Sequence, residues 1–77
     1  MPKYKVGSRV KMTKDALENY GPEWEGVILE VTHVARNTKE HPGYDDGVKG
    51  QGLYDLRRVD NLSELQFSLY DWELTGY

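Results

Sequence analysis

Alternating apolar and polar residues near the start of the chain predict a β-strand over residues 6–13. Val6, Val10 and Met12 fall in one phase of this segment, a pattern typical of a strand with one buried face. Residues 15–22 hold helix formers for a single turn before a Gly-Pro pair ends it. We expect this second segment to be a structured loop with a short helical turn.

The most β-prone run extends from residue 24 to residue 34 and predicts the second strand. Its aliphatic residues fall in both phases, with Val27, Leu29 and Val31 in one and Ile28 and Val34 in the other. Such a strand is either buried on both faces or bent partway along its length. In a domain of this size we expect a bend.

Three further short strands complete the pattern. Residues 52–59 have strand composition, and we expect Tyr54 and Leu56 to point inward there, although Leu53 and Val59 in the other phase leave the inward face open. Alternation over residues 65–69 predicts a fourth strand, and residues 72–75 follow a tight turn as a closing strand. The predicted core consists of Val10, Met12, Val27, Leu29, Val31, Leu56, Phe67 and Leu74.

Residues 37–52 separate the second and third strands and predict a long loop. This segment contains four glycines, one proline and only Tyr44 and Val48 as sizeable apolar residues. Loops of this length are uncommon in compact domains and are either mobile or functional. The loop is therefore the first place to look for a partner site, with Tyr44 either folded back onto the domain or presented to a partner.

Length and composition narrow the class of protein. A chain of 77 residues accommodates one hydrophobic core, so we predict a single domain over residues 1–77. The absence of cysteine excludes disulfides and thiolate metal sites. No run of 18 apolar residues and no leader-like start is present, which predicts a cytoplasmic protein without membrane contact.

The net charge of −3 conceals an uneven distribution. The first fourteen residues contain five basic residues and no acid, which gives +5, whereas the remaining five bases and thirteen acids give −8. The five basic residues are Lys3, Lys5, Arg9, Lys11 and Lys14. They either protect an edge strand from pairing or contact phosphate, and the acidic remainder predicts that any nucleic-acid binding is weak.

Few residues point to catalysis or to a metal. His41 precedes Asp45 and Asp46, but this spacing fits no recognised zinc or calcium pattern, and Asp-Asp-Gly is equally a turn sequence. Ser8, Ser63 and Ser68 have no histidine at nearby sequence positions. We therefore predict no catalytic residues, no cofactor and no metal site, and expect that the protein is not an enzyme.

The succession of five short strands, with a structured loop after the first, resembles an SH3-like small barrel. The resemblance extends to KOW-type modules of transcription elongation and ribosomal proteins and to the small SH3-like accessory protein of photosystem I. It rests on Val6-Gly7-Ser8-Arg9-Val10, on residues 25–31, on Leu53-Tyr54-Asp55-Leu56 and on Trp72-Glu73-Leu74. It implies an all-β, five-stranded SH3-like barrel. Short acidic chains of this kind are also similar to small proteins of bacteria and their phages.

Four large aromatic residues are the predicted protein-binding residues, because their loops meet on one side of an SH3-like barrel. They are Tyr20, Trp24, Tyr44 and Trp72, and rings on such a face anchor protein interfaces or stack bases. The leading hypothesis is a protein-binding module or adaptor. One alternative is a KOW-like nucleic-acid module that uses the five N-terminal basic residues; another is a structural accessory component of a larger assembly.

Overall fold

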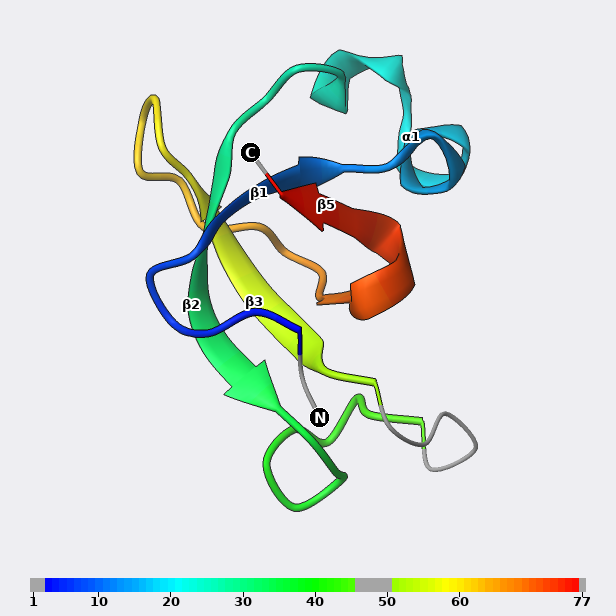
Figure 1. The fold of residues 1–77 in the computed structure, drawn as a ribbon, viewed down its shortest axis with the longest axis vertical. Coiled ribbons are helices and arrows are strands. Elements are labelled where there is room, and N and C mark those ends of the chain that lie inside the picture. Colours follow the sequence, from blue (N-terminus) through cyan, green and yellow to red (C-terminus); the bar gives the residue numbers. More distant parts are fainter. Residues whose placement is uncertain (1–2, 46–50, 77) are drawn as a thin grey trace.

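The protein is built around one antiparallel sheet of five strands (Figure 1). The computed structural model describes residues 3–45 and 51–76. The strands are β1 (Arg9–Met12), β2 (Leu29–Ala35), β3 (Leu53–Arg58), β4 (Leu69–Tyr70) and β5 (Leu74–Gly76), in the order β4-β3-β2-β1-β5. This confirms the expected all-β class. The described sheet ends at β4 and β5 and is not closed.

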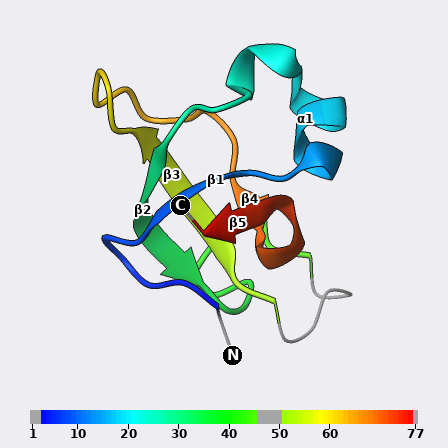
Figure 2. The same cartoon turned by 45° about the horizontal axis from the view of Figure 1, so that its top comes forward.

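The segment after β1 is more helical than the predicted structured loop. It forms α1 (Lys14–Tyr20) and then the 3-10 turn η1 (Pro22–Trp24). Thr13 caps α1, because its Oγ1 accepts a hydrogen bond from the Ala16 amide at 3.3 Å. Figure 2 shows α1 at the opposite end of the sheet from the segment that follows β2. In the part of the chain that the structure describes, no helix has the length and apolar character of a membrane span.

The predicted bend in the second strand is present as a β-bulge. The register between β2 and β3 shifts between Val31 and His33, and the Thr32 hydroxyl donates to the Asp55 carbonyl oxygen at 3.1 Å. A bulge bends its strand and changes which face the following residues meet. The shift explains why Val34 packs against the same core as Val31 although the two differ in phase, while Ala35 packs in a second cluster. Ile28 precedes the bulge and is not explained by it.

The main core combines buried residues of all five strands with Ala16 of α1. Of the predicted core residues, Val10, Met12, Leu29, Val31, Leu56 and Leu74 are buried, whereas Val27 and Phe67 pack against this core and are only partly buried. Tyr54 and Leu56 both face the main core, as predicted. The adjacent Leu53 instead joins Ala35 and Tyr44 in the second cluster.

The fourth and fifth strands are shorter than the sequence pattern predicts. Leu65 donates its amide hydrogen to the Leu56 carbonyl oxygen at 2.9 Å, but regular pairing with β3 resumes only at β4. Trp72, the predicted first residue of the closing strand, belongs instead to the 3-10 turn η2 (Asp71–Glu73), and β5 begins at Leu74. The Glu73 carboxylate stabilises this turn by accepting the Tyr70 amide hydrogen at 2.9 Å.

Candidate functional site

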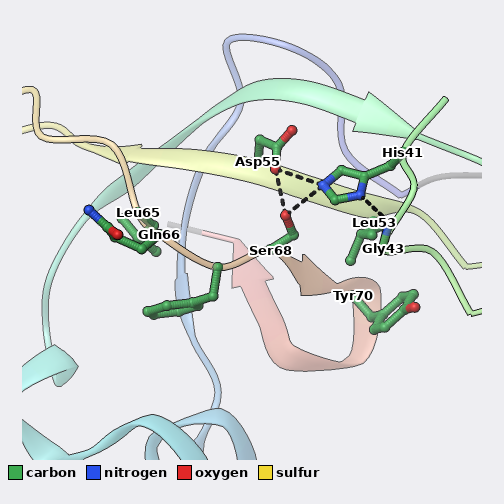
Figure 3. Close-up of a pocket in the computed structure, with 9 residues that line it drawn as sticks. His41, Gly43, Leu53, Asp55, Leu65, Gln66, Ser68 and Tyr70 are labelled. Atoms are coloured by element: carbon green, nitrogen blue, oxygen red, sulfur yellow. Dashed lines mark hydrogen bonds and ion pairs between the residues drawn. The ribbon is translucent and has the colours of Figure 1, made fainter.

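A hollow of about 350 Å3 opens beside β3, between the turn at residues 41–43 and the segment that leads into β4 (Figure 3). We call it the His41 hollow. Its apolar walls come from Leu53, Leu65, Phe67 and Tyr70, and its polar groups from His41, Asp55, Gln66 and Ser68. Apolar walls with a few convergent polar groups are the usual composition of a ligand-binding site.

Three of these polar side chains form a closed hydrogen-bonded network. His41 Nε2 lies 3.0 Å from Ser68 Oγ and 3.3 Å from Asp55 Oδ1. The Ser68 hydroxyl donates to the same oxygen of Asp55, and the Gly43 amide donates to His41 Nδ1 at 2.9 Å. The imidazole therefore holds the residue 41–43 turn against β3 and Ser68.

These hydrogen bonds determine what the network can do chemically. Because His41 Nδ1 accepts the Gly43 amide hydrogen, the neutral ring carries its proton on Nε2, where it donates to Ser68 and Asp55. The Ser68 hydroxyl proton is directed at the carboxylate and not at the imidazole. A serine nucleophile requires the reverse, an imidazole nitrogen free to accept its proton. The arrangement thus favours a binding surface with fixed polar groups.

A second hollow of about 380 Å3 adjoins the first. We call it the Glu64 hollow; it is lined by Thr32, His33, Asp55, Leu56, Glu64 and Leu65. Asp55 and Leu65 line both hollows. The two hollows therefore form neighbouring parts of one surface, with the Asp55 carboxylate at their junction.

Aromatic side chains continue this surface toward the end of α1. Phe67 lines the His41 hollow, and it stacks on Tyr20 with ring centroids 4.3 Å apart. Trp24 meets Phe67 edge-on at 5.8 Å, and the Arg58 guanidinium lies 5.6 Å from the Trp24 ring centroid. We call Tyr20, Trp24 and Phe67 the aromatic cluster.

The four predicted protein-binding residues do not form one group. Tyr20 and Trp24 are brought together by Phe67. Tyr44 is folded back: it is buried against Tyr70, and its hydroxyl donates to the Gln51 carbonyl oxygen at 2.6 Å. Trp72 lies on η2 and is 50% exposed.

The tyrosine of the aromatic cluster stays protonated over a wide pH range. Burial, and then the negative charge of Glu73, raise the pKa of Tyr20. Burial likewise raises the pKa of Glu73, which is 5% exposed, and the hydrogen bond from the Tyr70 amide opposes this effect. The ring of Tyr20 therefore presents a neutral surface to any partner.

The five basic residues proposed to contact nucleic acid are all exposed: Lys3, Lys5, Arg9, Lys11 and Lys14. On β1, Arg9 stands opposite Glu30 of β2, and Lys11 stands opposite Thr75 of β5. Glu30 is already paired with Arg57, whose Nη2 lies 2.6 Å from Glu30 Oε1. The basic residues follow β1 and its flanks and do not line either hollow.

The sequence did not single out the network of His41, Asp55 and Ser68. His41 is 14 residues from Asp55 and 27 from Ser68, so no local spacing relates them. Among residues 3–45 and 51–76, no three histidine, cysteine or acidic side chains are grouped as metal ligands would be. Of the acids considered with His41, Asp46 lies outside the described residues.

Comparison with protein-family models, with curated proteins and with solved structures finds no match to this chain.

Proposed function

We propose that the protein is a small, non-enzymatic module that binds another protein through the His41 hollow and the adjoining aromatic cluster. We also propose that its fold is an SH3-like barrel. The strand order β4-β3-β2-β1-β5 supports this fold, as does the 3-10 turn before the last strand.

The observation that carries the proposed function is the composition of the His41 hollow. Its walls are apolar, and its carboxylate, hydroxyl and imidazole are already held in place by one another. Groups fixed before binding lose little conformational entropy when a partner arrives. Large rings beside such a hollow, here Phe67 with Tyr20 and Trp24, are the typical anchors of protein interfaces.

Capture of partners from a cell lysate with a blocked hollow tests this proposal. Gln66 is exposed and lines the hollow, so Gln66→Arg fills the site without entering the core. Leu62→Arg is the matched control, because Leu62 is 61% exposed in the same segment but lines neither hollow. We expect the parent chain and Leu62→Arg to retain a partner protein after nuclease treatment and a salt wash. We expect Gln66→Arg to lose that partner. Equal retention by all three would contradict the proposal.

A nucleic-acid module remains the second candidate function. The exposure of all five N-terminal basic residues favours it, since within the described chain none of them forms an ion pair. It predicts that a single-stranded oligonucleotide binds with an affinity that falls steeply with salt. Neutralising Arg9 and Lys11 should lower that affinity. An affinity that changes neither with salt nor with this neutralisation would refute this candidate.

A further inference from the structure

We propose that the Glu64 hollow binds the cationic side chain of a lysine or arginine in the partner protein, beside an apolar residue seated in the His41 hollow. This inference rests on the proposed function and specifies the chemistry of its partner. The occupant is an extended peptide segment that carries both side chains.

Uncompensated negative charge is the first reason. Asp55 and Glu64 line the Glu64 hollow together with the imidazole of His33, and no lysine or arginine does. The nearby guanidinium groups are engaged elsewhere: Arg57 is 2.6 Å from Glu30, and Arg58 is 2.8 Å from Asp60. Within the described residues, the Glu64 carboxylate has no cationic partner. A partner's ammonium or guanidinium group would provide the missing positive charge.

The orientation of Asp55 is the second reason. Its Oδ1 accepts from Ser68 and lies beside His41 Nε2. Its other oxygen points away from both (Figure 3) and has no hydrogen-bond donor among the described residues. A carboxylate held by one oxygen and open at the other is a fixed acceptor for a charge-assisted hydrogen bond. The side chain is 40% exposed, so a partner can reach it.

The adjacency of the two hollows defines the peptide motif. Side chains two residues apart in an extended segment point to the same side and are roughly 7 Å apart. Because the hollows share Asp55 and Leu65, we expect such a pair to place one side chain in each. The basic residue would meet Asp55 and Glu64, and a leucine or aromatic residue would meet Leu65 and Phe67.

Selection from a phage-displayed library of random dodecapeptides tests this inference. The full chain is the target, and Gln66→Arg serves for counter-selection. We expect enriched peptides with a lysine or arginine two residues from a leucine or aromatic residue. Their synthetic versions should bind Glu64→Gln about threefold to tenfold more weakly than the parent chain. Glu18→Gln, another exposed acid outside both hollows, should bind them unchanged.

The possible failures are distinguishable. Peptides that depend on Gln66 but lack a basic residue, or that bind Glu64→Gln as well as the parent, would overturn the inference and leave the proposed function intact. If no peptide is enriched over Gln66→Arg, the inference is overturned, and the lysate capture described above decides the proposed function separately. Self-association of the chain that Glu64→Gln abolishes would make a second copy the occupant and would also overturn the inference.

Discussion

Replacing Tyr54 with phenylalanine removes one hydroxyl from the centre of a half-buried hydrogen-bonded network. The Tyr54 side chain is fully buried, its hydroxyl accepts the Tyr4 amide hydrogen at 2.9 Å, and it donates to the Asp71 carboxylate. Asp71 in turn accepts the Gly52 amide hydrogen at 3.0 Å. The hydroxyl thus links the N-terminal segment, β3 and η2, while a phenylalanine ring would keep the same packing.

The expected loss follows from the groups left behind. Tyr54→Phe leaves the half-buried Tyr4 amide without its acceptor, whereas the Asp71 carboxylate loses one donor and keeps the Gly52 amide. A group left unsatisfied on burial costs about 1–3 kcal/mol. We expect the free energy of unfolding to fall by about 1–3 kcal/mol at pH 7. Tyr20→Phe is the control: the Tyr20 hydroxyl makes no hydrogen bond within the described chain, so its loss should change stability by less than about 0.5 kcal/mol.

The same hydroxyl predicts a loss of stability in alkali. Burial and then the hydrogen bond to Asp71 raise the pKa of Tyr54 to about 12. The folded protein therefore keeps a proton that the unfolded chain releases near pH 10, and stability falls as pH rises from about 10 to about 12. The slope reaches about 1.4 kcal/mol per pH unit for this one group. The raised pKa of Tyr20 adds to the effect.

Urea unfolding followed by tryptophan fluorescence, at pH 7 and at several values from 9.5 to 11.5, measures both effects. Tyr54→Phe should be less stable than the parent at pH 7 and should lose less stability as the pH rises. Tyr20→Phe should retain the part of the alkaline slope that Tyr54 causes. A Tyr54→Phe protein as stable as the parent, or with an unchanged alkaline slope, would refute this account of the network.

Three further substitutions test other parts of the structure. Leu56 is 1% exposed in the main core, so Leu56→Ala should lower the free energy of unfolding by about 2–5 kcal/mol, measured by urea unfolding. The total for a chain of this length is about 4–12 kcal/mol, and a loss below about 1 kcal/mol would contradict the placement of Leu56 in the core. Thr13→Ala removes the cap of α1 and should cost about 1 kcal/mol and speed amide exchange in α1, whereas Thr13→Ser should do neither. Burial raises the pKa of Glu73, so its favourable contribution is complete below the unfolded pKa and is lost as pH rises through the folded value. Glu73→Gln should therefore be more stable than the parent at pH 7 but not at pH 4, and equal stability at both would contradict the burial of this carboxyl group.

Local patterns in the sequence were sufficient for the strands that pack on the main core. In β3, alternation favoured Tyr54 and Leu56 as the inward pair, and both are buried, although Leu53 in the other phase is buried as well. The aliphatic residues in both phases of β2 signalled the bend that the bulge at Thr32 provides. Strand phase is a local property, since it depends on side chains two residues apart.

Contacts between distant residues decided what the sequence pattern left open. Tyr44 stands among polar and glycine residues, and only its packing on Leu53 and Tyr70 shows that it is folded back. His41 similarly gains its role from Asp55 and Ser68, which approach it because β3 and the segment before β4 lie side by side. Neither the second cluster nor the His41 network has a signature in sequence spacing.

Mapping a selected peptide onto the protein by amide chemical shifts tests the binding face most directly. The measurement titrates the most enriched dodecapeptide into isotopically labelled protein and records which backbone amides shift. We predict the largest shifts at residues 53–56 and 64–70, with smaller ones at Tyr20 and Trp24. Shifts confined to β1 and its basic flanks, or to Trp72, would contradict the assignment of the binding face to the two hollows and the aromatic cluster.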